Sequence, residues 1–289
     1  MERKPKPSRE YTVNTETTLL PFLLESVGDK SRNTVKGLLT RGQVLVDGRC
    51  VTRHDHRLFP SQQVTILPEA LKRAALPFPV LWEDEEILVV DKPAGLLSMA
   101  SDRERERTAY RQVTDYVRAK DPKARVFIVH RLDRDTSGVL LFAKSERIKR
   151  AFQDNWDTIV CRRGYTAVVE GMPPKAKETI RTFLQENGIH KVYSVQTGGK
   201  EAITHYSTVR QGKRYSLLEI DLSTGRKNQI RVHLSELGCP VAGDRTYGAK
   251  TDPLRRLCLH AHELTFVHPL TGKETTYRAE LPRGFRKLI

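Results

Sequence analysis

The chain has 289 residues, a length that indicates one large domain or two unequal ones. Because 50 basic residues stand against 35 acidic ones, the formal net charge is +15, and the 38% of hydrophobic residues is enough to bury a core. This excess of positive charge is spread along the whole chain, which favours nucleic acid as a partner over a surface of merely solvated lysines. The four cysteines form no Cys-x-x-Cys pair, which excludes a zinc ribbon, a thioredoxin-type redox site and a disulfide framework.

The N-terminus gives no sign of export. The first ten residues are polar and basic and contain no apolar run, so they do not resemble a secretory signal. No apolar stretch approaches the roughly 18 residues that a membrane span needs. We therefore expect a cytoplasmic protein with reduced thiols and no membrane partner.

Two domains joined by a linker are predicted. Residues 1–13 are expected to form a flexible tail, and residues 14–70 hold enough helical and strand patterns for a small domain. Residues 71–79 contain a basic pair and two prolines, so they are interpreted as a linker stiffened at its end. The larger domain is expected to occupy residues 80–289.

The small domain is predicted to contain two short helices followed by a β-ribbon. Apolar residues at helical spacing over residues 19–24 predict the first helix, and Ser31 is a suitable N-cap for the second. A strand is predicted at residues 44–46, and Asp47-Gly48 is a strong signal for a hairpin turn into the next strand.

The larger domain mixes strand and helix patterns at irregular spacing. Strands are predicted at residues 87–90, 126–129, 139–143, 165–169 and 216–222, and helices at residues 109–117, 148–159 and 230–237. The remainder of the chain is expected to hold only turns and short strands. This order predicts an α+β domain with a mixed sheet rather than regular βαβ repeats.

One segment, residues 130–138 with the sequence HRLDRDTSG, stands between two apolar strands. It holds two carboxylates, three cationic or potentially cationic side chains and two hydroxyls. Loops at strand ends often carry catalytic groups because the sheet holds them rigidly, although a solvated, charge-rich turn explains this density equally well. A kinase catalytic loop is excluded, because Leu132 separates the aspartate from the His-Arg pair and no phosphate-binding glycine loop precedes it.

The segment closely resembles the His-Arg-Leu-Asp-x-x-Thr-Ser-Gly signature of the RluA-type RNA pseudouridine synthases. Further blocks similar to the family pattern follow in its order, at residues 83–95, 163–171, 224–244, 259–261 and 268–269. The resemblance covers roughly residues 80–289. It implies the pseudouridine synthase fold, a mixed and largely antiparallel sheet with flanking helices, and the isomerisation of uridine to pseudouridine in RNA.

Residues 14–70 resemble the αL (S-four-type) RNA-binding domain. The similarity rests on Ser31-Arg32, on residues 42–48 and on the closing strand at residues 64–66. It implies that basic side chains near the second helix meet RNA phosphates, and we expect this of Arg32, Lys36 and Arg41. A solvated helix face is the alternative.

The resemblance assigns three catalytic residues. Asp133 matches the carboxylate that acts by covalent attack or by removing a sugar proton, and both routes need it ionised. Arg231 matches the arginine that pairs with this aspartate, where a guanidinium would lower the pKa of the carboxyl. Tyr165 matches the active-site tyrosine, whose ring is suited to stack on uracil. From the residues alone, a helix-surface arginine and a core tyrosine are the alternatives.

A uridine in a duplex must leave the base stack before it can react. Arg131 is expected to fill the vacated place or to hold a neighbouring phosphate, and Arg226 is expected to contact RNA as well. Lys92 is expected to meet a phosphate, with a structural role in its turn as the alternative. The reaction has no redox step and needs no outside energy, so we expect no cofactor.

Several other residues of the motifs are interpreted as structural. The histidines have spacings that build no zinc set, so packing roles are favoured over metal binding for His130, His233, His260 and His268. Thr136 and Ser137 are expected to satisfy backbone groups of their loop, and Gly138 is expected to permit close chain approach.

The expected substrate is structured RNA, with large-subunit ribosomal RNA favoured by analogy and transfer RNA as the alternative. A monomer is expected. Asn228 stands where many family members have histidine, and Ser98 stands where a histidine often follows the Lys-Pro-x-Gly turn. These departures bear on subfamily and substrate. Two other functions stay open: a non-catalytic RNA-binding protein and an RNA glycosylase that cleaves without rejoining.

Overall fold

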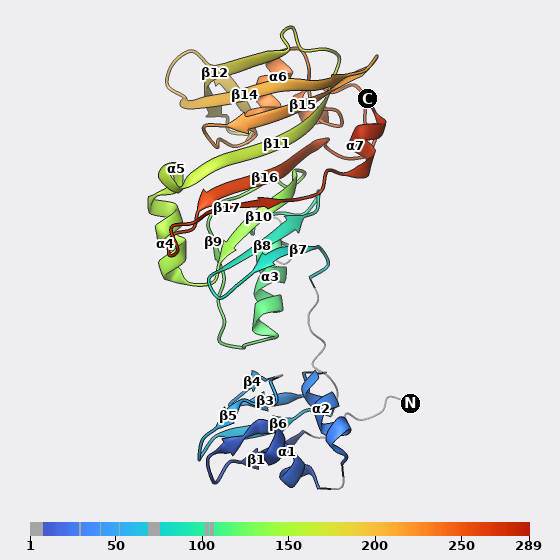
Figure 1. Cartoon of the computed structure of the whole chain (residues 1–289). Helices are drawn as coiled ribbons and strands as arrows, with labels where there is room; N and C mark the ends of the chain where they lie inside the picture. The colour runs from blue at the N-terminus through green and yellow to red at the C-terminus, as the bar shows by residue number, and fades with distance from the viewer. Residues whose placement is uncertain are drawn as a thin grey trace. The chain divides into compact units, whose positions relative to one another are not determined.

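The computed structural model describes residues 8–28, 30–40, 42–51, 53–68, 76–101, 104 and 107–289. Two compact units make up the chain (Figure 1). The N-terminal unit extends to Pro77 and takes in residues 112–125, and the C-terminal unit comprises residues 78–111 and 126–289. None of the helices in the described ranges combines the length and the apolar character needed to cross a bilayer.

The N-terminal unit packs two helices against small sheets. Its helices are α1 (Leu19–Val27) and α2 (Arg32–Thr40). The four-stranded sheet has the order β1-β6-β3-β4, formed by Arg9–Thr12, Gln63–Ile66, Val44–Val46 and Arg49–Cys50, and β2 (Thr17–Thr18) pairs with β5 (Arg57–Leu58). The shared core is apolar and includes Leu19, Leu23, Val35, Leu39, Val44 and Val64.

Two local predictions for this unit are confirmed. The Thr34 backbone N–H donates to the Ser31 hydroxyl over 3.3 Å, so Ser31 caps α2. Asp47 and Gly48 both have positive φ, 49° and 80°, as a tight turn between the paired strands β3 and β4 requires.

The predicted tail at residues 1–13 needs correction at its C-terminal end. Residues Arg9–Thr12 form β1, which pairs antiparallel with β6, and Val13 is buried. The strand side chains are mostly exposed, so β1 is held mainly by backbone hydrogen bonds and shows no alternation of apolar residues. Of the predicted linker, residues 71–75 lie outside the described residues, and Phe78 is buried.

The C-terminal unit is built on one 11-stranded sheet with the order β13-β12-β14-β15-β11-β16-β10-β8-β7, in which β17 also pairs with β16 and β9 with β10. The strands β7 to β17 are, in order, Val80–Glu83, Ile87–Lys92, Phe127–Ile128, Ser137–Ala143, Val160–Glu170, Lys177–Glu186, Val192–Val195, Lys200–Gln211, Tyr215–Leu222, Leu259–Val267 and Glu274–Arg278. Among the described strand pairs, only β10 and β16 run parallel. The predicted mixed, largely antiparallel sheet is therefore confirmed.

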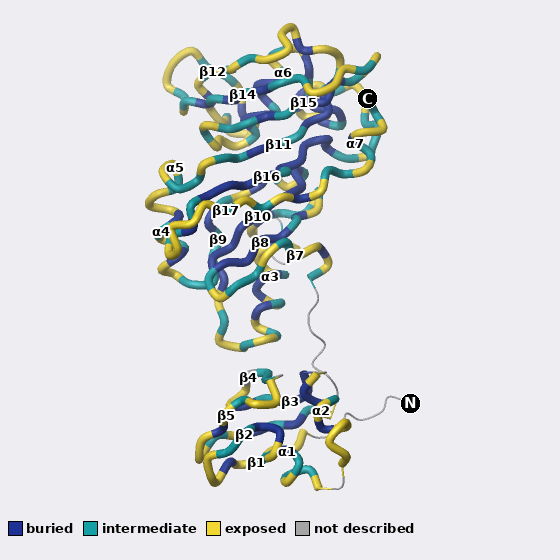
Figure 2. Tube along the Cα trace, in the orientation of Figure 1, coloured by how far each residue is buried: buried dark blue, intermediate teal, exposed yellow. Residues whose placement is uncertain are grey.

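Helix α3 (Ala109–Arg118) begins in the C-terminal unit and continues into residues 112–118 of the N-terminal unit; the other helices of the C-terminal unit are α4 (Glu146–Asp154), α5 (Trp156–Ile159), α6 (Gln229–Glu236) and α7 (Arg283–Lys287). Two cores lie along the sheet. In the first, Ile148 and Phe152 of α4 pack against β8 and β10, and in the second, Ile230 and Leu234 of α6 pack against β11 and β15. Every residue of β10 is buried, so the strand that carries the HRLDRDTSG segment is a fixed support (Figure 2).

The prediction of only turns and short strands after residue 237 is wrong. The nine-residue strand β16 lies between β11 and β10 in the centre of the sheet. Its sequence LHAHELTFV looks too polar for a central strand, but each polar side chain makes at least one hydrogen bond, although Nε2 of His260 is buried without a partner among the described residues. The carboxylate of Glu263, for example, accepts hydrogen bonds from Arg162 and Arg278. Strands β12 to β14 were also not predicted from the sequence.

Candidate active site

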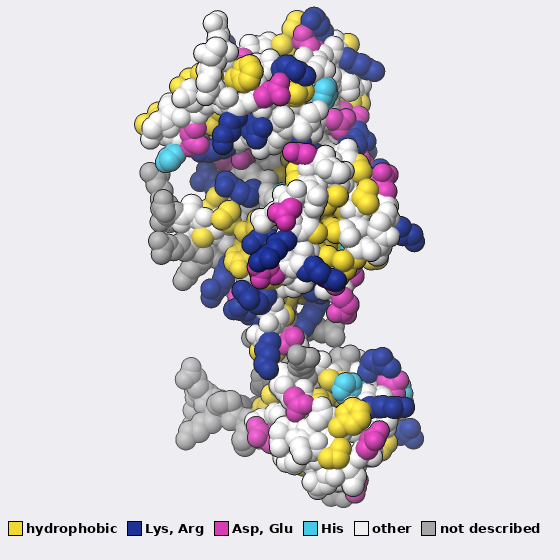
Figure 3. Space-filling view, turned by 90° about the vertical axis from the view of Figure 1, so that its left-hand side faces the viewer, with side chains coloured by type: hydrophobic (Ala, Val, Ile, Leu, Met, Phe, Trp, Pro, Cys, Tyr) yellow, Lys and Arg dark blue, Asp and Glu magenta, His cyan; other side chains and the backbone are white. Residues whose placement is uncertain are grey.

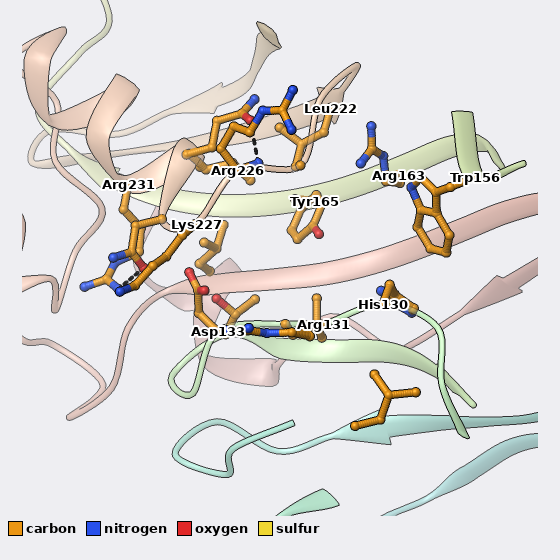
Figure 4. Close-up of a pocket in the computed structure, with 18 of the residues that line it drawn as sticks. His130, Arg131, Asp133, Trp156, Arg163, Tyr165, Leu222, Arg226, Lys227 and Arg231 are labelled. Atoms are coloured by element: carbon orange, nitrogen blue, oxygen red, sulfur yellow. Dashed lines mark hydrogen bonds between the residues drawn. The ribbon is translucent and has the colours of Figure 1, made fainter. Parts of the chain in front are cut away.

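A cleft of about 730 Å³ opens on the C-terminal unit between residues 128–136, β11 and the start of α6. Six of its lining side chains bear on the chemistry: Asp133, Tyr165, Arg231, Arg131, Arg163 and Arg226. Figure 3 shows Lys and Arg side chains gathered around a hollow in this unit, and Figure 4 shows Asp133 and Tyr165 on facing walls of the cleft. The three predicted catalytic residues therefore come together in space.

Gly138 anchors the catalytic segment to the sheet. Its φ is 116°, and a Cβ atom there would lie 2.0 Å from the carbonyl oxygen of Ala261, with which it pairs across β10 and β16. The predicted close chain approach is confirmed, because only glycine fits this position. The prediction that Ser137 satisfies backbone groups of its loop is wrong. Its hydroxyl instead lies 2.8 Å from Nδ1 of His260 and accepts a hydrogen bond from Arg256.

The backbone on both sides of Asp133 is fixed by the turn that follows β8. The Ser98 hydroxyl donates to the Leu132 carbonyl over 2.7 Å and accepts from the Leu132 N–H over 3.0 Å. The Lys92 ammonium donates to the Arg134 carbonyl over 3.0 Å. Because residues 132 and 134 are both held, the backbone that carries Asp133 is positioned before any substrate binds.

Lys92 does not meet a phosphate, and this prediction is corrected. Its side chain is fully buried, and Nζ donates to the carbonyls of Pro93, Leu96 and Arg134. Burial lowers the pKa of the ammonium to about 7, although Asp135 and Asp133 act in the opposite direction. The structural alternative for this lysine is therefore correct.

Lys92→Met is accordingly expected to destabilise the protein rather than to weaken RNA binding by the folded molecule. The partly buried carbonyls of Pro93 and Leu96 would lose their donor, while the Arg134 carbonyl keeps the Gly95 N–H. At about 1–3 kcal/mol for each unsatisfied group, the melting temperature should fall by roughly 5–10 °C. Calorimetry of this variant beside Lys213→Met, an exposed control, measures the effect. If Lys92→Met keeps the parental melting temperature but binds RNA more weakly, Lys92 contacts a phosphate after all.

Asp133 is a half-buried carboxylate surrounded by cations. Burial raises the pKa of its carboxyl above the usual range, while Arg231, Arg131 and Lys92 act in the opposite direction. The backbone N–H of Asn228 also lowers the pKa of this carboxyl. Among the described residues, Asp133 forms no ion pair, so its oxygens face the cleft without a fixed cationic partner.

The predicted ion pair between Arg231 and Asp133 is not formed. Arg231 instead makes a bidentate pair with Asp244, with Nε–Oδ2 and Nη2–Oδ1 distances of 2.7 and 2.8 Å. Its Nη1 donates to Oδ1 of Asn228 over 2.8 Å, and the guanidinium lies over the Tyr247 ring. Arg231 therefore acts on Asp133 through its charge and not through a hydrogen bond, and the surface-arginine alternative is wrong.

Tyr165 lies on β11, opposite Ile220 of β15, and its ring enters the cleft from the wall that faces Asp133 (Figure 4). Burial raises the pKa of its hydroxyl to about 12, Arg163 lowers it, and Asp133 raises it further. The hydroxyl is therefore a hydrogen-bond donor at neutral pH. The ring also packs against the core beneath α6, so the core alternative holds in part, and stacking on uracil stays a prediction.

Residues 86–236 match the model of the RNA pseudouridylate synthase family. The chain belongs to this family. YlyB, an uncharacterized RNA pseudouridine synthase of Bacillus subtilis, is 34% identical over 278 residues, which cover 93% of this chain and 91% of the relative. The ribosomal large subunit pseudouridine synthase D of Xanthomonas campestris is 30% identical over 289 residues, which cover 92% of this chain and 86% of the relative.

Among solved structures, the human RNA Pseudouridylate Synthase Domain Containing 4 has the same fold, with a TM-score of 0.60 at 22% identity over 72% of this chain and 90% of that chain. The RluA-type assignment of the catalytic region is confirmed, and with it the isomerase activity. The glycosylase and the non-catalytic protein are set aside. The family match begins at residue 86, so the αL domain stays a prediction.

The synthase has one cleft arginine that the motif comparison did not single out. Arg163 stands two residues before Tyr165 on β11, so the period of a strand places both on the same face. Its Nη2 donates to the Ser223 carbonyl over 2.6 Å, and a Cβ atom on Gly225 would lie 2.7 Å from its Nη1. The strand period was the signal that could have found it.

Three arginines of the cleft, Arg131, Arg163 and Arg226, form no ion pair with a carboxylate in the part of the chain that the structure describes. By contrast, Lys227 pairs with Glu186 over 2.5 Å. Arg32 and Lys36 are exposed on α2 of the N-terminal unit, and Arg41 lies outside the described residues. The RNA contacts of all these residues stay predictions.

The histidines of the synthase occupy structural positions. Nε2 of His130 accepts the Leu141 N–H over 3.0 Å, and burial lowers the pKa of this imidazole to about 3. His233 lies between the hydroxyls of Thr182 and Thr204, each 2.8 Å away. His260 contacts Ser137 as described above, and His268 accepts the Leu270 N–H over 3.3 Å. Nowhere in the described ranges do three His, Cys, Asp or Glu side chains gather as metal ligands would.

Proposed function

We propose that this synthase isomerises uridine in structured large-subunit ribosomal RNA, with Asp133 as the reacting carboxylate. The observation that carries the proposal is a carboxylate in a cationic cleft, faced by an aromatic ring, that makes no ion pair with any residue the structure describes. The ribosomal substrate rests on relatives such as the large subunit synthase D of Xanthomonas campestris. Transfer RNA is the competing substrate.

In the proposed reaction, the target uridine flips into the cleft at an unstacking cost of about a few kcal/mol. Ionised Asp133 then attacks C1′ or removes the C2′ proton, and the N-glycosidic bond breaks. The uracil turns and its C5 bonds to C1′, which releases the Asp133 oxygen in the first route; in the second route, the proton returns to C2′. C5 then loses its proton to solvent or to a cleft group, and N1, which left the sugar as an anion, gains one. Substrate and product have the same atoms, so the reaction needs no co-reactant. The Tyr165 ring stacks on the uracil during this turn.

Arg131, Arg163 and Arg226, which pair with no carboxylate in the described ranges, are assigned to the RNA backbone. Arg163 and Arg226 come from one wall and the loop above it, while Arg131 comes from the catalytic segment (Figure 4). Phosphates on either side of a flipped nucleotide supply the anions that these guanidiniums lack. The N-terminal unit is assigned a second RNA contact through Arg32 and Lys36 on the exposed face of α2.

Arg163→Ala is expected to weaken binding of a substrate RNA and to reduce the slope of log affinity against log salt by about 1, because one phosphate contact is lost. Arg210→Ala, which removes an exposed arginine outside the cleft, is the matched control. Filter binding at several salt concentrations measures both. Equal slopes for the parent and Arg163→Ala would refute the phosphate contact.

The substrate is tested by mapping pseudouridines in total RNA from cells with and without the gene. Loss of a pseudouridine in large-subunit RNA, restored by the parent but not by Asp133→Asn, supports the proposal. Loss confined to transfer RNA would overturn the ribosomal assignment and leave the enzyme class intact.

A further inference from the structure

We propose that Asn228 is a positioning residue that holds Arg231 at a distance from Asp133 and so keeps the Asp133 oxygens available to the sugar. The inference rests on the proposed function, because it takes Asp133 as the reacting group. Asn228 stands immediately before α6 and lines the cleft. Its side chain contacts Arg231, and its backbone N–H lowers the pKa of the Asp133 carboxyl.

The backbone of Asn228 adopts the left-handed conformation, with φ 54° and ψ 17°. Asparagine is one of the few residues other than glycine that tolerate this region. Of the described non-glycine residues with positive φ, Asn228 is the one that lines the cleft. In this conformation the backbone N–H of Asn228 lowers the pKa of the Asp133 carboxyl. Backbone strain at such a place is commonly retained because it positions a functional group.

The side-chain amide of Asn228 bridges two groups. Oδ1 accepts from Nη1 of Arg231 over 2.8 Å, and Nδ2 donates to the Tyr247 hydroxyl over 3.1 Å. This orientation of the amide is required, because a guanidinium only donates hydrogen bonds. The Tyr247 hydroxyl also accepts the Val192 N–H over 3.2 Å, so the bridge is anchored to β13.

These contacts engage all three nitrogens of Arg231. Nε and Nη2 bind Asp244, Nη1 binds Asn228, and the Tyr247 ring lies 4.8 Å from the guanidinium carbon. Held in this way, Arg231 stabilises the charge of Asp133 without occupying its oxygens. A direct Arg231–Asp133 pair would instead use the same oxygens that must reach the ribose. Asn228 therefore lets the positive charge of Arg231 stabilise Asp133 while the Asp133 oxygens accept no hydrogen bond from Arg231.

Two substitutions separate the contributions of Asn228. Asn228→Gly keeps the left-handed backbone and its N–H but removes the amide, which frees Arg231 to move toward Asp133. Asn228→Asp tolerates the same backbone and keeps an oxygen for Arg231, but it places a second carboxylate beside Asp133. The other charged or titratable groups facing Asp133 are Arg231, Arg131, Lys92 and Tyr165.

We expect Asn228→Gly to lower the single-turnover rate on bound RNA by roughly 10–100-fold with less change in RNA affinity, because small misplacements of a catalytic group cost this much. Asn228→Asp is expected to move the acid limb of the pH–rate profile to higher pH. A second negative charge disfavours ionisation of Asp133, which must be ionised to react. A residue that serves folding alone would not move this limb.

Rates are expressed per folded molecule. Each of the two Asn228 variants has a control that makes the same kind of substitution at an exposed site. Asn14→Asp adds the same charge at an exposed site in the N-terminal unit, and Arg255→Gly places glycine at another exposed left-handed position, with φ 53°. Both should keep the parental rate and profile. Parental rates and profiles in both Asn228 variants, with Asp133→Asn inactive, would overturn this inference and leave the proposed function standing. Product formation by Asp133→Asn would overturn the proposed function itself.

Discussion

Asp133→Asn is expected to bind RNA about as well as the parent and to form no detectable pseudouridine. The amide has the shape of the carboxylate but can neither attack C1′ nor remove a sugar proton. Removing an essential nucleophile or base typically costs at least about 10⁴-fold in rate. RNA binding should not suffer, because the substitution removes a negative charge from a cleft lined by Arg131, Arg163 and Arg231.

The measurement is pseudouridine formed per enzyme in a single turnover, with RNA binding determined on the same preparations. Asp135→Asn is the matched control, since Asp135 pairs with Arg134 at the surface and does not line the cleft. It should react at the parental rate. Activity retained by Asp133→Asn and lost in Asp135→Asn would transfer the catalytic role to the second aspartate of the motif.

Arg231→Gln is expected to impair both stability and catalysis. The side chain of Asp244 is 1% exposed, and losing its partner leaves a buried charge, which costs about 3–5 kcal/mol. Loss of the guanidinium also raises the pKa of the Asp133 carboxyl, because Arg231 lowers it in the parent. Since Asp133 must be ionised to react, the acid limb of the pH–rate profile should move to higher pH.

The double variant Arg231→Gln/Asp244→Asn separates these two effects. It removes both charges of the buried pair, so most of the lost stability should return. The acid limb should stay displaced, because Asp133 still lacks its cationic neighbour. Urea unfolding and a pH–rate profile provide the two measurements. If activity returns together with stability, Arg231 acts only as a structural partner of Asp244.

Much of the site could be predicted because its signals are local. The run from residue 130 to 138 carries the aspartate, its loop and the glycine that lets β10 approach β16. The apolar runs of β8, β10 and β11 and the helix that ends at Gly238 were also clear in the sequence. Each of these features is encoded within about ten residues by pattern and turn chemistry.

The partner of Arg231 could not be predicted in the same way. The fold brings two carboxylates, Asp133 and Asp244, near Arg231. No local sequence pattern shows which of the two forms the ion pair with it. Lys92 was misjudged for a related reason. Lys92 is the last residue of β8 and the first of the Lys-Pro-x-Gly turn, and a lysine in a turn is expected to be exposed. The structure shows instead that three carbonyls surround its ammonium. Long-range hydrogen bonds decide both cases.

The most direct measurement is the structure of Asp133→Asn bound to a short RNA that contains the target uridine. We expect the uridine everted into the cleft, its ribose against residue 133, its base on the Tyr165 ring and the adjacent phosphates at Arg163 and Arg226. A target base that stays stacked in the RNA, or a ribose far from residue 133, would contradict the proposed mechanism.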